Sequence, residues 1–249
     1  SNGDKVTKGG WYHINYDNMV FVTGGGSHYV KERIYKASGI FRKYSFNDSK
    51  KSWDMNKNLW KNTGRKLMYF DGSGTCTILY DQASNILYRY ISSSKSYKRV
   101  SNVIDKLNGN RYYFYDANGN RRTSSGWKKV NGSTAYYVCD GGYVTSRYTD
   151  QKGTKKVYDF DYSKNTWVQK KNMWKTVYRS RYYFGSKGVA TISYNNSTKK
   201  AYKFTGRKWK PAKKLIMKIG NANYYFNSAA KRVVKAGKYK TADGYIAYV

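Results

Sequence analysis

Short runs in which aromatic and polar residues alternate recur along the chain, as in Tyr88-Arg89-Tyr90 and Tyr202-Lys203-Phe204. Turn-forming residues such as Asp116-Ala117-Asn118-Gly119 follow, and then a second alternating stretch. Alternation on both sides of a turn predicts a β-hairpin. The hydrophobic residues that close these runs lie 20 to 24 positions apart: Val22, Phe46, Phe70, Tyr90, Phe114, Val138, Phe160, Phe184, Phe204, Phe226 and Tyr248. The pattern therefore predicts an all-β chain of about eleven hairpins.

The hairpins also recur as a longer unit, because one set of residues appears twice at a spacing of 114. The set is Tyr44, Phe46, Trp53, Trp60, Tyr69, Phe70, Gly74 and Tyr80, repeated as Tyr158, Phe160, Trp167, Trp174, Tyr183, Phe184, Gly188 and Tyr194. Such self-similarity indicates stacked units rather than one globular core. We expect residues 30–147 and 148–249 to be two blocks of five hairpins in one continuous array. Residues 1–29 are expected to end a preceding repeat.

Composition supports thin sheets and suggests a class of partner. The 249 residues are 39% hydrophobic and include 29 tyrosines, whose rings pack while their hydroxyls stay in water. Lys and Arg number 48 against 14 Asp and Glu, a net charge of +34 spread along the whole chain. Such a field attracts polyanions: nucleic acid, teichoic acid, sulfated glycan or an anionic membrane. The alternative is that the charge serves solubility.

The sequence offers no constellation for catalysis, metal binding or a cofactor, so we expect a non-catalytic chain. His13 and His28 have no counterpart in the repeats, and no phosphate-binding loop or nucleophile motif appears. The turn positions Asp71, Asp116 and Asp140 suit hydrogen bonds from a carboxylate to the backbone better than acid–base chemistry. Any catalytic activity is expected in a domain upstream.

Cys76 and Cys139 are expected to be two small unpaired thiols, because Ala190 stands where the repeat would place a second copy of Cys76. No apolar run approaches the 18 residues of a transmembrane helix. We expect a monomer without a transmembrane segment.

Two glycine-rich segments carry a resemblance to a known family. They are Gly126-Trp127-Lys128-Lys129-Val130-Asn131-Gly132, followed by residues 136–144, and residues 108–119. These segments resemble the cell-wall-binding hairpin repeats of Gram-positive surface proteins, a group that includes choline-binding modules, glucan-binding repeats of glucansucrases and repetitive regions of clostridial toxins. The resemblance implies a solenoid of hairpins with ligands in shallow sites between consecutive hairpins.

The resemblance also implies where ligands would bind. Candidate residues for stacking on a glycan or polymer are Trp11, Trp53, Trp60, Trp127, Trp167, Trp174, Trp209, Tyr113, Tyr183 and Tyr225. Candidate charge contacts are Lys61, Lys128, Lys129, Lys175 and Lys210. The tryptophans could equally serve only to seal the seams between hairpins. Choline is disfavoured as the ligand, because Ile104 and Ile216 occupy two of seven ring positions and a surface at +34 repels a free cation.

The resulting hypothesis is a module that attaches a secreted Gram-positive protein to the cell wall through an anionic polymer, with teichoic acid as the first candidate, or through another surface glycan. One alternative is an α-glucan-binding arm of a glucansucrase-like enzyme. Another is an adhesin or toxin arm that binds host glycans. Single-stranded nucleic acid also suits rings interleaved with charge, but no established nucleic-acid-binding motif appears, so it is a less favoured partner.

Overall fold

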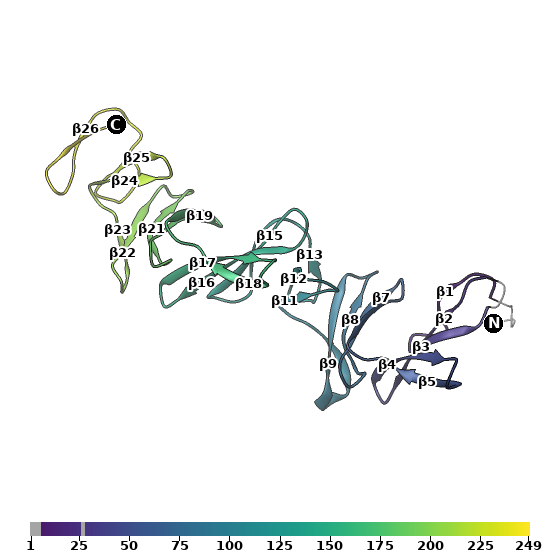
Figure 1. Cartoon of the computed structure of the whole chain (residues 1–249). Helices are drawn as coiled ribbons and strands as arrows, with labels where there is room; N and C mark the ends of the chain where they lie inside the picture. The colour runs from purple at the N-terminus through teal and green to yellow at the C-terminus, as the bar shows by residue number, and fades with distance from the viewer. Residues whose placement is uncertain (1–5, 26–27) are drawn as a thin grey trace. The chain divides into compact units, whose positions relative to one another are not determined.

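A computed structural model describes residues 6–25 and 28–249, and in these residues the chain is all-β (Figure 1). The first sheet, sheet 1, is an antiparallel meander of five consecutive strands. Its strands are β1 (Gly10–His13), β2 (Asn18–Val22), β3 (Val30–Ala37), β4 (Ile40–Asn47) and β5 (Ser52–Met55).

Sheet 2 repeats this arrangement, with a short 3-10 turn at Ser92–Ser94 before its last strand. Its strands are β6 (Leu59–Asn62), β7 (Lys66–Phe70), β8 (Cys76–Asp81), β9 (Ile86–Ile91) and β10 (Ser96–Arg99). A smaller sheet follows, composed of β11 (Val103–Lys106), β12 (Tyr112–Tyr115) and β13 (Arg121–Arg122).

Sheets 4 and 5 are again five-stranded antiparallel meanders. Sheet 4 contains β14 (Gly126–Lys129), β15 (Thr134–Val138), β16 (Val144–Gln151), β17 (Thr154–Asp161) and β18 (Thr166–Gln169). Sheet 5 contains β19 (Met173–Val177), β20 (Ser180–Phe184), β21 (Ala190–Asn195), β22 (Ala201–Phe204) and β23 (Trp209–Pro211). Two hairpins follow, β24 (Leu215–Ile219) with β25 (Ala222–Phe226) and β26 (Lys238–Lys240) with β27 (Ile246–Tyr248).

The chain divides into two compact units. The first comprises the chain up to Gly109 together with Tyr115–Arg122, and the second comprises Asn110–Phe114 and Thr123–Val249. Sheets 1 and 2 therefore belong to the first unit, and sheets 4 and 5 to the second. The repeat relates sheet 4 to sheet 1 and sheet 5 to sheet 2.

A turn that is repeated in both units shows how closely the local structure is copied. The ladder shifts register between Tyr69 and Phe70 in sheet 2, and again between Tyr183 and Phe184 in sheet 5. After each shift a glycine adopts a left-handed conformation, with φ of 78° at Gly74 and 69° at Gly188. A side chain at Gly188 would also clash, because its Cβ would lie 2.2 Å from the Gln169 amide nitrogen. The left-handed backbone favours glycine at both positions, and at Gly188 the Gln169 side chain would also have to move to admit a Cβ.

The predicted role of two turn carboxylates is confirmed. An Asp71 oxygen accepts backbone N–H groups from Ser73 at 2.9 Å and Thr75 at 3.1 Å. Asp116 accepts the corresponding bonds from Asn118 and Asn120, both at 2.9 Å. These carboxylates fix turns between strands.

The hydrophobic core of each unit lies between consecutive sheets. In the first unit Met19, Ile34 and Phe41 of sheet 1 pack with Phe70 and Cys76 of sheet 2. In the second unit a cluster joins Val157 of sheet 4 to Phe184 and Ala190 of sheet 5. Cys76 and Ala190 occupy equivalent positions, both without exposed surface, which explains why only a small residue fits. Both cysteines are unpaired.

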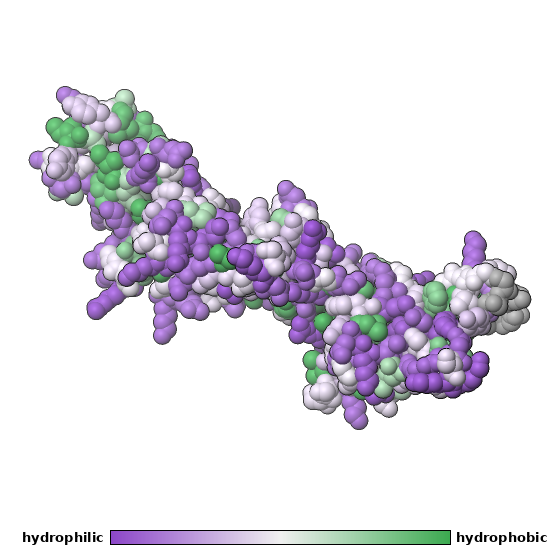
Figure 2. Space-filling view, viewed as in Figure 1, coloured by the Kyte–Doolittle hydropathy of each residue, from purple (hydrophilic) through white to green (hydrophobic). Residues whose placement is uncertain are grey.

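The side of the molecule seen in Figure 2 is mostly hydrophilic. Hydrophobic residues gather visibly over the C-terminal hairpins β24 to β27, where Ile216, Val234 and Ile246 are exposed. In the described part of the chain, no helix is long and apolar enough to cross a membrane.

A thin core makes each buried ring important for stability. We expect Phe184→Ala to lower the free energy of unfolding by about 3–5 kcal/mol, because it removes a fully buried ring and leaves a cavity between two sheets. The exposed Val168→Ala is the control and should change it by less than about 0.5 kcal/mol. Urea unfolding followed by circular dichroism measures both. A loss below about 1 kcal/mol for Phe184→Ala would contradict a core located between the sheets.

Candidate binding faces of the sheets

All seven tryptophans are half-buried, and two of them connect consecutive sheets. The indole N–H of Trp127, on β14, donates to the backbone oxygen of Thr176, on β19, at 3.0 Å. The indole N–H of Trp209, on β23, donates to the Gly153 oxygen in the β16–β17 turn, also at 3.0 Å. Both indoles pack against the core cluster between sheets 4 and 5. These contacts hold the seam within the second unit.

The other candidate tryptophans each lie against a ring on the neighbouring strand of their own sheet. The ring centroids are 5.7 Å apart for Trp11 and Phe21, 5.2 Å for Trp60 and Tyr69, and 5.5 Å for Trp174 and Tyr183. Trp53 lies 5.3 Å from Phe46, and Trp167 lies 5.0 Å from Phe160. Such cross-strand ring pairs stabilise a sheet locally. Tyr113 and Tyr183 are half-buried, whereas Tyr225 is buried and donates to the Lys240 oxygen at 2.9 Å.

The candidate lysines differ in whether a carboxylate already neutralises them. Lys61 pairs with Glu32 at 2.6 Å, and Lys175 pairs with Asp159 at 3.3 Å. Lys128 donates to the Ser124 hydroxyl at 3.0 Å. Lys129 and Lys210 are exposed. Lys61 and Lys175 are therefore neutralised within the protein, and positive charge available to a ligand must come from other basic residues.

The two paired lysines reveal a charge network that the repeat has rearranged. In sheet 1, Glu32 lies directly opposite Ser45 and also pairs with the buried Lys43 at 3.0 Å. In sheet 4 the equivalent opposing residues are Ser146 and Asp159, so the carboxylate has moved to the partner strand. Lys61 and Lys175, which the repeat relates, are paired in both cases. A carboxylate therefore pairs with the lysine in both units, but β3 supplies it in the first unit and β17 supplies it in the second.

The electrostatics of these carboxylates follow from their surroundings. Burial alone would raise the pKa of Glu32, but hydrogen bonds from Lys61 and Lys43 outweigh it and hold the pKa below its usual range. Burial also raises the pKa of Asp159, but the hydrogen bond from the Ser146 hydroxyl and the nearby Lys175 outweigh it and hold the pKa below its usual range. Burial lowers the pKa of the Lys43 ammonium. Both carboxylates are therefore ionised in the folded protein near neutral pH.

A second pair of repeat-related residues presents positive charge on aromatic rings. The Arg33 guanidinium carbon lies 4.4 Å from the centre of the Trp53 ring and 5.3 Å from that of Tyr44. Arg147 lies 5.0 Å from Trp167 and 4.5 Å from Tyr158. Cation–π contacts of this kind contribute about 0.5–2 kcal/mol. Within the described residues neither arginine forms an ion pair, in contrast to Arg89 and Arg122.

Sequence reasoning selected Trp53 and Trp167 but missed the arginines that lie on them. The signal was available, because Arg33 and Arg147 are separated by the same 114 residues as the tryptophans. A guanidinium that stacks by its face can donate N–H groups from its edge to an oxyanion, although Nε of both arginines is buried and Arg147 also interacts with the Tyr136 hydroxyl. The arrangement combines an apolar ring surface with a fixed positive charge.

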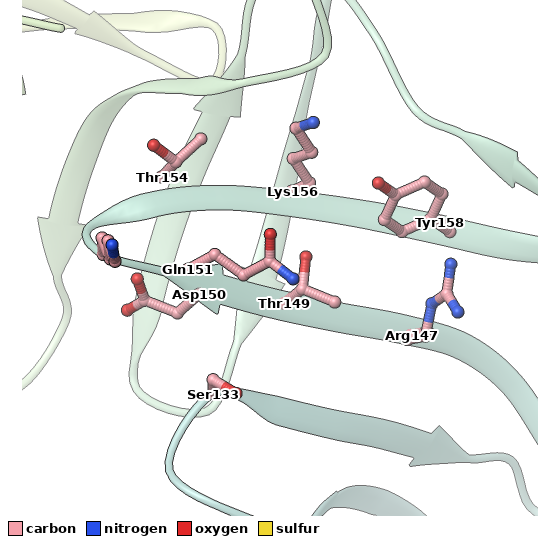
Figure 3. Close-up of a pocket in the computed structure, with 9 residues that line it drawn as sticks. Ser133, Arg147, Thr149, Asp150, Gln151, Thr154, Lys156 and Tyr158 are labelled. Atoms are coloured by element: carbon pink, nitrogen blue, oxygen red, sulfur yellow. The ribbon is translucent and has the colours of Figure 1, made fainter.

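A hollow of about 780 Å³ lies on the face of sheet 4 next to one of these arginines (Figure 3). Its lining residues are Ser133, Arg147, Thr149, Asp150, Gln151, Lys152, Thr154, Lys156 and Tyr158. Asp150 is paired with Lys155 and accepts the Gly153 N–H at 3.1 Å, so its charge is locally neutralised. Arg147, Lys152 and Lys156 have no carboxylate partner in the described part of the chain.

The described residues contain no group of three or more His, Cys, Asp or Glu side chains arranged to hold a metal ion. Burial is the largest cause that lowers the pKa of His13, with Arg65 and Lys66 nearby, and it is opposed by a hydrogen bond that the ring donates to the Thr63 backbone. Burial raises the pKa of the Cys76 thiol to about 12, so this thiol is protonated at neutral pH and inert.

The depressed pKa of Glu32 makes stability depend on pH. A carboxyl with a lower pKa in the folded state stabilises it above the unfolded pKa, about 4.3, and this contribution disappears as the pH falls through the folded pKa. We expect Glu32→Gln to cost roughly 1–3 kcal/mol at pH 7, because Lys43 is left buried without its partner, and clearly less at pH 3.

Urea unfolding across pH 3 to 7 measures this difference. Asp48→Asn is the control, because Asp48 belongs to an exposed pair with Lys31, and such pairs contribute little. A Glu32→Gln effect that is equal at pH 3 and pH 7 would exclude the proposed linkage.

No protein-family model matches the chain, and no curated protein matches it. Similar solved structures include choline binding protein F from Streptococcus pneumoniae in the presence of a peptidoglycan analogue, 16% identical with a TM-score of 0.27, covering 97% of this chain and 97% of that one. Alternansucrase in complex with isomaltononaose is 16% identical with a TM-score of 0.23, covering 94% of this chain and 18% of that one.

The modular Cpl-1 endolysin complexed with a peptidoglycan analogue is also 16% identical, with a TM-score of 0.21, covering 76% of this chain and 39% of that one. The chain thus spans less than a fifth of the alternansucrase and well under half of the endolysin. With TM-scores below 0.5, these likenesses carry no argument about sites or ligands, which rest on the chain's own residues. The similar structures belong to the group of choline-binding and glucan-binding hairpin repeats that the sequence motifs resemble.

Proposed function

We propose that the chain is a non-catalytic module that attaches a secreted Gram-positive protein to the bacterial cell wall through an anionic polymer such as teichoic acid. The observation that carries the proposal is the repeated arginine on a tryptophan and a tyrosine, Arg33 in the first unit and Arg147 in the second. Rings stack on apolar faces of sugars, and guanidinium N–H groups pair with phosphate.

The net charge of +34 and the repetition strengthen this proposal. Internal carboxylates neutralise only part of the basic residues, so a polyanion meets positive charge along the chain. If the hairpins stack as a solenoid, repeated weak sites engage successive units of one polymer. The second contact is then intramolecular, and modest single-site affinities combine into firm attachment.

Sedimentation with purified Gram-positive walls tests the function directly. Walls with intact teichoic acid should retain the chain at 50 mM NaCl, and acid-stripped walls should retain little. Retention should fall steeply as NaCl rises to 500 mM, because the polyanion releases counterions when it is neutralised. Binding that is indifferent both to stripping and to salt would rule out an electrostatic wall module.

A neutral α-glucan is the second candidate, because the ring pairs Trp60–Tyr69 and Trp174–Tyr183 recur at the repeat spacing. Affinity electrophoresis in dextran gels distinguishes the two ligands. An α-glucan module would be retarded regardless of salt and would lose retardation on Trp60→Ala or Trp174→Ala. A wall-polymer module would migrate as it does without dextran, and these substitutions would not change its migration.

A further inference from the structure

The hairpins β3–β4 and β16–β17 are repeat equivalents, yet their outer faces differ towards the turn. Two residue pairs lie directly opposite each other on each face: Arg33 with Tyr44 and Tyr35 with Arg42 in the first unit, and Arg147 with Tyr158 and Thr149 with Lys156 in the second. Both faces therefore carry the arginine, its tyrosine and a second basic residue. They differ at Tyr35, which Thr149 replaces, and at the next pair, where Gln151 and Thr154 replace Ala37 and Ile40.

Tyr35 fills the face of the first unit. Its ring stacks on Tyr44 with centroids 5.4 Å apart and an interplanar angle of 9°, and the Arg33 guanidinium lies 5.4 Å from it. Arg33 is thus surrounded by three rings. Thr149 has no ring to place there, and the hollow of about 780 Å³ lies at this position in the second unit. Its volume falls within the roughly 300–1,000 Å³ typical of ligand sites.

The hollow is lined by basic side chains and by neutral side chains that carry hydroxyl or amide groups. Figure 3 shows Lys156 and Tyr158 on β17 and Arg147, Thr149 and Gln151 on β16. Arg147 and Lys156 are diagonal neighbours in the ladder, which places their Cα atoms about 7–8 Å apart, close enough for both long side chains to reach one oxyanion. Beyond them, Thr149, Gln151 and Thr154 offer hydroxyl and amide groups.

We propose that this hollow binds one acidic unit of an anionic glycan, with the oxyanion held by Arg147 and Lys156 and the polyol hydroxyls by Thr149, Gln151 and Thr154. The inference rests on the proposed function and specifies where on the chain one unit of the polymer binds. Arg147 is positioned for this role because Trp167 and Tyr158 hold its guanidinium. Phosphate and carboxylate both suit a guanidinium edge.

Calorimetric titration of the full chain at 50 mM NaCl tests the site, with a glycerol phosphate hexamer and an oligogalacturonate as separate probes. Thr149→Tyr should weaken binding roughly tenfold by placing the residue of the first unit in the hollow. Arg147→Gln should weaken it to a similar degree, because a charge-assisted hydrogen bond is lost. The probe that binds and responds to both variants identifies phosphate or carboxylate as the acidic group.

Matched controls separate the site from its surroundings. Lys164→Gln removes one exposed charge from the β17–β18 turn, and Thr166→Tyr adds a ring at an exposed position of β18. Each should change affinity by less than twofold. Circular dichroism melts report folding, and Thr149→Tyr decides the question if Arg147→Gln unfolds.

The failures of the two proposals are distinguishable. A wild-type chain that binds neither walls nor either probe overturns the proposed function and the site together. A wild-type chain that binds walls, with all four variants within twofold of it, overturns the hollow alone. Tighter binding of a single-stranded oligonucleotide that is lost in Thr149→Tyr overturns a glycan as the occupant.

Discussion

Each five-stranded sheet has an apolar face and no helix to cover it, so that face can be buried only against the next sheet of the same unit. The clusters Met19–Phe70 and Val157–Phe184 form in this way. Isolated hairpins are only marginally stable, and the shared core supplies what each sheet lacks. Trp127 and Trp209 close this seam with indole hydrogen bonds to the facing sheet. Their position between sheets thus follows from the same constraint.

The same constraint places charge. With one face of every sheet committed to packing, the 48 basic residues are divided between the other face and the turns. The partly buried Lys61 and Lys175 are neutralised by Glu32 and Asp159, which lie on opposite strands of equivalent hairpins. Both pairs join neighbouring sheets, so neutralisation depends on proximity between the sheets rather than on which strand supplies the carboxylate. Arg33 and Arg147 are stabilised by rings instead, which leaves their charge unneutralised.

The sequence allowed the all-β class to be predicted, and several residues that close its alternating runs lie in the core. Phe70, Phe114, Phe184 and Phe226 close alternating runs and are all buried. The joining of hairpins into five-stranded meanders was not predicted, because it depends on where the ladder is interrupted. Asn58 and Asn172, with φ of 52° and 51°, lie at equivalent breaks between sheets. Asparagine tolerates this left-handed conformation, but Asn is frequent in this chain, so these positions did not stand out.

The candidate site was predictable to a smaller extent. Repeat spacing marked Trp53 and Trp167, and it would have marked Arg33 and Arg147 as well. The difference between Tyr35 and Thr149 was not informative, because both residues favour strands and both occur at outward positions. The effect of this difference on the face can be seen only when the residues opposite Tyr35 and Thr149 in the ladder are known. At an outward position such an exchange changes the binding face at little cost to folding, since the core between the sheets is untouched. Duplication of a sheet pair therefore allows a tyrosine to cover part of one arginine face while its copy carries a hollow beside the equivalent arginine.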